Sequence, residues 1–220
     1  MRDILTQTFD AVLFDNDGTL IDSHAAVERS WAAWALDHGI PAQRFVGFHG
    51  MPSRGIVARV APELDDLEAA VSDIDRRELE DTEGVVALPG AAAALSALGA
   101  RAAIVTSAGR DLARRRIGAA GLTPPVVMVT ADDIPAGKGK PDPLPYLTGA
   151  ARLGVDPARC LVVEDAPAGL RAGRAAGAAV VGITSTSNAE ELEPLADLVV
   201  SDLSQLTFTV TGEGVRIALR

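Results

Sequence analysis

Apolar runs rich in β-branched residues alternate along the chain with helix-like segments. The runs predict buried strands at residues 11–15, 102–106, 126–130, 161–165 and 178–183. The segments between them predict helices at residues 90–98, 111–120, 143–153 and 166–176. Two last runs, 206–210 and 215–219, flank a Gly-rich loop and predict a closing antiparallel hairpin. Apolar strands that alternate with helices are typical of a parallel sheet covered on both faces, so the sequence predicts a doubly wound α/β fold.

One connection is much longer than the others. Roughly 70 residues separate the first strand from the helix that opens at Pro89-Gly90, whereas such connections usually take only a few residues. This stretch predicts three helices, at residues 25–38, 53–60 and 64–82. We therefore expect a helical cap domain over residues 22–88, inserted into a core domain made of residues 1–21 and 89–220.

The charge of the chain limits its partners. The formal net charge is -10, which argues against a nucleic-acid partner because phosphate backbones are bound mainly by clustered Lys and Arg. The one basic run, Arg114-Arg115-Arg116, lies on a predicted helix, and we expect it to form a solvated helix face. Net charge does not exclude a small phosphorylated substrate, because a metal ion and a few local cations decide that binding.

No stretch of the sequence points to a membrane or to export. No apolar segment reaches the roughly 18 residues that span a membrane, and the polar N-terminus shows no targeting signal. The single cysteine, Cys160, lies in an apolar run, so a disulfide framework is excluded and a reducing compartment fits. We expect a cytoplasmic protein, monomeric, with no membrane partner.

Polar residues with reactive side chains stand at the ends of the predicted strands. Ligands of an open α/β sheet bind outside the carboxyl ends of its strands. The segments at these ends are Asp15-Asn16-Asp17-Gly18, Thr106-Ser107, the loop Lys138-Gly139-Lys140, and Glu164-Asp165. If the predicted fold is right, these segments converge at one edge of the sheet.

The first segment has the chemistry of a metal-assisted reaction. Asp15 and Asp17 flank one residue, and Gly18 permits a sharp turn, so both carboxylates can lie near one point. Two adjacent like charges need a cation, and oxygen ligands from Asp15, Asp17 and Asp165 suit Mg²⁺. An Asp carboxylate can also attack phosphorus and split hydrolysis into two displacements through an aspartyl phosphate. Taken alone, however, this segment can equally be a polar turn.

The lysines support the reactive interpretation. Lys138 and Lys140 are the only lysines in the chain, and both lie in one loop. A compact ammonium group at Lys140 would offset negative charge on a nucleophile and on a transferring phosphoryl group. The hydroxyl of Thr106 and the neighbouring backbone amides would bind phosphate oxygens, although threonine is also a common residue at the end of a strand.

Four segments resemble, in order, the four motifs of the haloacid dehalogenase superfamily. They are residues 14–20 (Phe-Asp-Asn-Asp-Gly-Thr-Leu), 105–107 (Val-Thr-Ser), 139–143 (Gly-Lys-Pro-Asp-Pro) and 163–170 (Val-Glu-Asp-Ala-Pro-Ala-Gly-Leu). The match spans nearly the whole chain and implies a Rossmann-like core with Mg²⁺ as cofactor. Asn16 departs from the pattern, because relatives usually carry an apolar residue there.

The resemblance also implies a role for each matched residue. The nucleophile would be Asp15, the general acid/base Asp17 and the charge stabiliser Lys140. Phosphate would be bound by Thr106 and Ser107. The implied metal ligands are Asp15, Asp17 and Asp165, with Glu164 in support.

The inserted cap resembles the class that carries sugar phosphatases, glycerol-phosphate and 2-deoxyglucose-6-phosphate phosphatases, and β-phosphoglucomutases. Residues 141–147 and 164–169 resemble the sugar-phosphatase branch most, which implies a magnesium-dependent phosphatase for small phosphorylated metabolites, above all sugar or polyol phosphates. The main competing function is that of a sugar phosphomutase. Mutases of that kind are expected to carry a histidine at the position of Val27 and a lysine in the cap, and this cap has neither.

Three more distant kinds of protein fit the sequence less well. A phosphonate hydrolase also uses a cap lysine, a dehalogenase would not need Asp17 together with Asp165, and a binding module without catalysis would not need the full set of motifs.

Residues of the cap are candidates for substrate recognition. The loop 49–54 carries His49 and Arg54 and is expected to reach the site, where both side chains would bind substrate. It is equally open that His49 caps a helix and that Arg54 binds an exposed carboxylate. Trp31 and Trp34 have helical spacing and are predicted to form the core of the cap.

Overall fold

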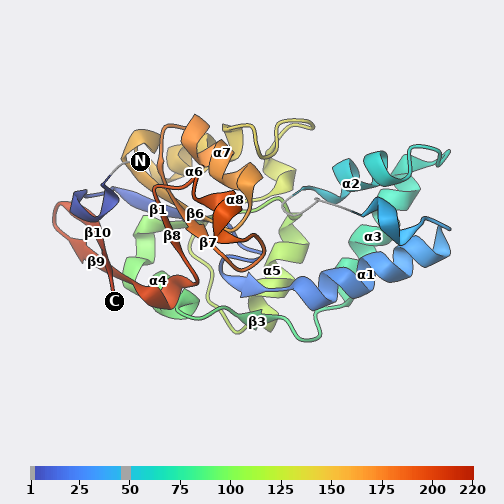
Figure 1. Cartoon of the computed structure of the whole chain (residues 1–220), viewed down its shortest axis with the longest axis horizontal. Coiled ribbons are helices and arrows are strands. Elements are labelled where there is room, and N and C mark those ends of the chain that lie inside the picture. Colours follow the sequence, from blue (N-terminus) through green and yellow to red (C-terminus); the bar gives the residue numbers. More distant parts are fainter. Residues whose placement is uncertain (1–2, 46–50) are drawn as a thin grey trace.

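The computed structural model of the chain, which describes residues 3–45 and 51–220, has an α/β core and a helical extension (Figure 1). The core contains a six-stranded sheet in the order β5-β4-β1-β6-β7-β8, and every strand pair is parallel. The strands are β1 (Ala11–Phe14), β4 (Ala102–Val105), β5 (Val127–Val129), β6 (Cys160–Glu164), β7 (Ala179–Ile183) and β8 (Leu198–Val200). The predicted doubly wound α/β fold is confirmed, and so are its five predicted strands. The edge strand β8 was not predicted, because a run of three residues gives too short a signal.

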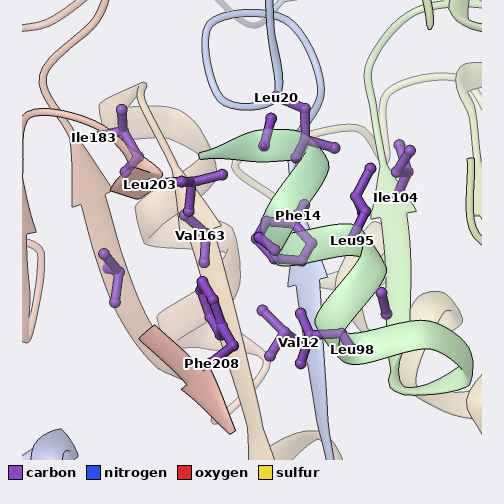
Figure 2. Close-up of a cluster of buried hydrophobic side chains, with 14 of the residues drawn as sticks. Val12, Phe14, Leu20, Leu95, Leu98, Ile104, Val163, Ile183, Leu203 and Phe208 are labelled. Carbon is purple, nitrogen blue, oxygen red and sulfur yellow. The ribbon is translucent and has the colours of Figure 1, made fainter. Parts of the chain in front are cut away.

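Helices and a hairpin cover the two faces of this sheet. One face packs against α4 (Ala91–Leu98), α5 (Arg110–Ala119) and the antiparallel hairpin of β9 (Leu206–Thr211) and β10 (Gly214–Leu219). The other face packs against α6 (Leu144–Leu153), α7 (Pro167–Ala175) and α8 (Ala189–Leu192). Figure 2 shows the first of these layers, in which Phe14 of β1 meets Phe208 of β9 edge to face at 6.0 Å between ring centroids.

The position of β1 in the sheet fixes the position of the site. From β1 the chain runs outward through β4 and β5 on one side, and then through β6, β7 and β8 on the other. The order of strands therefore reverses at β1, and in an open α/β sheet a crevice opens at the carboxyl ends beside such a point. The residues that follow β1, β4 and β6 lie at this crevice.

The cap forms a separate helical unit. Its helices are α1 (His24–Asp37), α2 (Ser53–Val60) and α3 (Leu67–Glu80), as the sequence predicts. They enclose their own hydrophobic cluster around Trp31 and Trp34, whose rings meet edge to face at 5.5 Å. The indole N–H of the fully buried Trp34 donates to the carbonyl of Ala70 at 2.9 Å. The prediction that this aromatic pair forms the cap core is confirmed.

The two chain crossings between cap and core lie side by side. A two-residue strand on each crossing, β2 (Ile21–Asp22) and β3 (Val86–Ala87), pairs with the other in antiparallel fashion. On the basis of this pairing and of the separate cap cluster we propose the division into residues 22–88 and residues 1–21 with 89–220.

The remaining elements are short 3₁₀ helices at Ile4–Thr6, Ala42–Arg44, Gly99–Arg101, Ala131–Asp133, Pro157–Arg159 and Leu203–Gln205. Within residues 3–45 and 51–220, no helix combines the length and the apolarity that crossing a membrane requires.

Candidate active site

The polar residues at the ends of three strands come together at the predicted edge of the sheet. Asp15 and Thr106 directly follow β1 and β4, and each extends its strand by one backbone hydrogen bond, from Asp15 N–H to the carbonyl of Val163 and from Thr106 N–H to that of Val129. Asp165 directly follows β6. All three side chains are buried at the base of a cleft between the core and the cap.

Lys140 is held at the centre of this edge. Its Nζ lies 2.6 Å from Oδ1 of Asp15, 2.5 Å from Oε1 of Glu164 and 2.9 Å from the carbonyl oxygen of Val105. These three acceptors use all three donors of the ammonium group. Burial alone would lower the pKa of Lys140, but the Asp15 and Glu164 carboxylates outweigh it and raise the pKa, so the side chain stays charged. Lys140 engages only one oxygen of Asp15, which leaves Oδ2 for bonding to an electrophile or a cation.

Three buried carboxyl groups form a candidate cation site. Asp15, Glu164 and Asp165 each offer an oxygen within 4.8 Å of the others. Burial, and then the neighbouring Glu164 and Asp165 carboxylates, raise the pKa of Asp15 well above its ordinary value although Lys140 opposes them. Burial and Glu164 also raise the pKa of Asp165 to about 7. Negative charge is therefore in excess here, and an all-oxygen donor set of this kind suits a hard divalent cation.

Within this group Glu164 is the most restrained member. Its Oε1 accepts a hydrogen bond from the hydroxyl of Tyr146 at 2.6 Å as well as the contact with Lys140. The carboxylate also packs directly against the backbone of Gly169 on α7, where an added Cβ would lie 1.8 Å from Oε1. These contacts fix the Glu164 carboxylate beside Lys140.

Replacing Gly169 by alanine is expected to displace Glu164. The new methyl group overlaps the carboxylate, so Gly169→Ala should lower the free energy of unfolding by about 3 kcal/mol, the cost of an overpacked core, and should reduce turnover. Urea denaturation measures this change. The matched control is Gly118→Ala on α5, where nothing lies within 4 Å of the added Cβ and a small gain in stability of about 0.5 kcal/mol is expected. Equal denaturation midpoints for the two variants would contradict the packing argument.

Asp17 lies apart from the acidic group. Its Oδ1 accepts hydrogen bonds from Ser23 Oγ at 2.7 Å and from Nη1 of Arg116 at 2.9 Å, and its Oδ2 accepts one from the Asn16 amide at 3.1 Å. The side chain is about one quarter exposed, toward the cleft. This placement suits proton transfer, whereas the role of Asp17 as a metal ligand stays a prediction.

Asn16, the residue that departs from the family pattern, is fully buried and donates to this carboxylate. Its own Oδ1 is buried, with no partner among the residues that the structure describes. Asn16 therefore adds a hydrogen bond to Asp17 that an apolar residue at this position could not make.

Arg116 corrects an expectation from the sequence. The run 114–116 was predicted to be solvated, but only Arg114 and Arg115 are exposed, and Arg116 is buried. Its Nη1 binds Asp17 and its Nη2 lies 3.1 Å from Oε1 of Glu78 on α3. Two carboxylates supply the partners that a buried guanidinium requires, and these contacts replace the water that Arg116 loses on burial. Helical spacing could have indicated it, since Arg116 lies on the same face of α5 as the buried Ala113 and Ile117.

The phosphate-binding candidates line the cleft. The backbone N–H of Ala108 donates to the hydroxyl oxygen of Thr106 at 3.1 Å, which leaves the Thr106 hydroxyl proton free to donate to a ligand. Ser107 follows it on the same wall. Arg54 also lines the cleft, from the cap, but its guanidinium pairs with the exposed Glu68. The predicted contact from His49 lies outside the described residues.

Besides Arg116, sequence reasoning missed three residues that contact the carboxylates of the site. They are Ser23 beside Asp17, Tyr146 beside Glu164, and Thr186, whose hydroxyl donates to Oδ2 of Asp165. Thr186 lies in the polar loop after β7, so the rule that ligands bind beyond strand ends could have found it. Nothing in the local pattern around Tyr146 distinguishes it from a core aromatic residue.

The site therefore combines a buried acidic group with a charged lysine beneath a covering cap, which is the arrangement of an α/β enzyme with its site at the carboxyl ends of the strands. The chain belongs to the haloacid dehalogenase-like hydrolase family, whose model matches residues 9–177. This agrees with the resemblance of its four sequence motifs.

Three known proteins that resemble the chain are informative. Hexitol phosphatase A of Escherichia coli is 42% identical over 210 residues, which cover 92% of this chain and 95% of that protein. Glycerol-1-phosphate phosphohydrolase 1 of Saccharomyces cerevisiae is 34% identical over 213 residues, which cover 90% of this chain and 84% of the relative. The crystal structure of a hydrolase from Pseudomonas syringae superimposes with a TM-score of 0.79 at 29% identity, over 89% of this chain and 94% of that one.

Proposed function

We propose that this protein is a magnesium-dependent phosphatase that hydrolyses sugar and polyol monophosphates through an aspartyl phosphate on Asp15. The observation that carries the proposal is the placement of Asp15, whose Oδ1 is held by Lys140 inside the acidic group while Asp17 stands outside that group. One carboxylate is thus placed to attack and the other to transfer protons.

The two steps follow from these placements. Oδ2 of Asp15 attacks phosphorus, the bond from phosphorus to the substrate oxygen breaks, and Asp17 gives its proton to the departing alkoxide. In the second step Asp17 takes a proton from water, the water oxygen bonds to phosphorus, and the bond to Asp15 breaks. Lys140 offsets the negative charge of the phosphoryl group in both steps, and Thr106 donates a hydrogen bond to one of its oxygens.

The acidic group supports Mg²⁺ as the cofactor. Asp15 and Asp165 would hold the ion with Glu164 in support, and a bound Mg²⁺ supplies positive charge that lowers the repulsion between nucleophile and phosphate. Without a cation, three buried carboxyl groups face only one buried lysine.

The pH dependence of metal binding tests this assignment. Because the pKa of Asp165 is raised to about 7, a cation must displace a proton below that pH. The apparent affinity for Mg²⁺ is expected to fall at least about tenfold for each pH unit below 7, because the pKa of the second ligand, Asp15, is raised as well. Calorimetric titration between pH 5.5 and 8.5 measures it, and Asp165→Asn should weaken binding and flatten the profile. A wild-type affinity that is constant across this range would contradict the assignment.

The substrate class is supported by relatives and by the cap wall of the cleft. The two phosphatase relatives are named for a hexitol phosphate and for glycerol 1-phosphate activity. On the cap wall Asp75 of α3 accepts a hydrogen bond from Ser53 at 2.6 Å, and both residues line the cleft. This pair can bond to substrate hydroxyls, whereas its negative charge disfavours a second acidic group on the substrate. An uncharged polyhydroxyl group attached to the phosphate fits this wall.

Hydrolysis is supported over phosphoryl transfer between sugar positions. Val27 lines the cleft at the place where a mutase is expected to carry histidine, and residues 22–88 contain no lysine. We further propose that the protein acts as a cytoplasmic monomer, which gel filtration with light scattering and cell fractionation test.

The decisive experiment measures phosphate release from a panel of hexitol, hexose, glycerol and nucleotide monophosphates, with Mg²⁺ or with EDTA. Magnesium-dependent release concentrated on the polyol and sugar phosphates is expected. Conversion of glucose 1-phosphate to an isomer without phosphate release would favour the mutase, and inactivity on the whole panel would overturn the proposal.

A further inference from the structure

Arg116 joins the core, the cap and the proposed general acid/base. It lies on the core helix α5 and binds Asp17, which follows β1, and Glu78, which belongs to the cap helix α3. The Arg116 and Glu78 side chains are 4% and 9% exposed, so the contact is withdrawn from solvent. An ion pair across the boundary of two domains at this depth is unlike the exposed pairs elsewhere on the chain, such as Arg54 with Glu68.

The guanidinium depends on both carboxylates. Burying a charged group is costly unless its partners replace water, and removing one partner of a buried pair is strongly destabilising. Nη1 and Nη2 have one carboxylate each, whereas the buried Nε has no partner among the described residues. The position of the Arg116 guanidinium is therefore fixed by its two terminal nitrogens, through Asp17 on the core side and Glu78 on the cap side.

The contact also selects one oxygen of Asp17. Arg116 and Ser23 both donate to Oδ1, and Ser23 directly follows β2, at the crossing into the cap. Among the residues that the structure describes, Oδ2 receives only the longer bond from Asn16. The proton that Asp17 transfers is thus best carried on Oδ2, with Oδ1 acting as the fixed point about which the carboxylate is oriented.

We propose that Arg116 is a positioning residue that orients Asp17 for proton transfer and, through Glu78, makes this orientation depend on the seating of the cap. The inference rests on the proposed function, because it assigns to Asp17 the acid/base role. When the cap moves away from the core, Arg116 loses its Glu78 anchor and Asp17 loses part of its support. Proton transfer is then efficient only with the cap seated over a substrate.

A substrate with a good leaving group separates the two chemical steps. In p-nitrophenyl phosphate the bond from phosphorus to phenolate oxygen breaks without a proton, so attack by Asp15 does not need Asp17. Hydrolysis of the aspartyl phosphate does need Asp17, because a proton of the attacking water must be removed. With enzyme in excess over substrate, release of p-nitrophenol reports the first step and release of phosphate reports the second.

Arg116→Met is expected to leave the first step within about twofold and to slow phosphate release about 100-fold, the lower range of general acid/base catalysis. Turnover of glycerol 1-phosphate, whose alkoxide needs a proton, should fall by a similar factor.

Glu78→Gln, which keeps the shape of the cap anchor but removes its charge, should slow the same steps about tenfold. Arg116→Lys should recover part of the loss because it keeps a cation beside Asp17. In an Asp17→Asn background, Arg116→Met should add no further loss.

The control is Arg115→Met on the exposed side of the same helix, which should match the wild type in both steps. Equal slowing of both steps in Arg116→Met and in Glu78→Gln would reduce Arg116 to a structural role and overturn the inference, as would phosphate release within twofold of wild type in either variant. Should Arg116→Met fail to fold, Glu78→Gln and Arg116→Lys decide the matter. Absence of both steps in the wild-type enzyme would instead refute the proposed function.

Discussion

Asp15→Asn is expected to abolish turnover while the fold survives. The amide cannot attack phosphorus, so kcat should fall at least about 1000-fold, as for other residues that form the covalent intermediate. The fold should persist because Lys140 keeps its contacts with Glu164 and with the carbonyl of Val105. The change in the free energy of unfolding at neutral pH should stay within about 1 kcal/mol.

The pH dependence of this variant has a definite sign. Burial and neighbouring carboxylates raise the pKa of Asp15, so the folded protein binds a proton more tightly than the unfolded chain does. Over the pH range between the unfolded pKa and the raised folded pKa, the unfolded chain has lost this proton while the folded protein keeps it. The free energy of unfolding of the wild type therefore falls as pH rises through this range. In metal-free buffer Asp15→Asn should gain on the wild type as pH rises from 5 to 8.

Thermal unfolding across this range, together with phosphate release, measures both parts of the prediction. Asp37→Asn is the matched control, since Asp37 lies on the exposed side of the cap outside the cleft and its loss should leave activity unchanged. Residual activity of Asp15→Asn above a few per cent would show that another group attacks phosphorus.

Lys140→Met is expected to lose both stability and activity. The substitution leaves Asp15 and Glu164 buried without their shared cation, and breaking a buried pair costs roughly 3–5 kcal/mol. Turnover should fall at least about 100-fold, because the charge that offsets the phosphoryl group is gone. The loss of stability should be largest at pH 8 and smaller at pH 5, where the raised pKa of Asp15 lets that carboxyl group take up a proton and remove part of the unpaired charge.

The chain supplies its own control for this variant. Lys138 is the only other lysine, lies two residues away, and pairs with Asp142 at 3.2 Å with more than half of its side chain exposed. Lys138→Met should leave stability and turnover unchanged. Urea denaturation at pH 5 and pH 8 and steady-state kinetics compare the two variants. Equal free energies of unfolding and equal turnover in the two would refute the central role of Lys140.

The fold and the place where the candidate site residues meet could be predicted from the sequence. Buried parallel strands give continuous apolar runs, and the carboxyl ends of parallel strands share one edge of the sheet. The residues after such runs, Asp15, Thr106 and Asp165, therefore had to meet, and the structure brings them to the base of one cleft. The three cap helices were also predictable, because their boundaries depend on nearby breaks in the chain.

Which charged and polar groups contact these site residues could not be predicted from the local pattern and depends on packing across the fold. Arg116 is buried because Asp17 and Glu78, far from it in sequence, supply its partners. The contacts of Tyr146 with Glu164 and of Thr186 with Asp165 likewise join separate elements. Periodicity records whether a residue faces a core, but a buried polar group is stable only when its partners are in place, and the partners are fixed by packing across the whole fold.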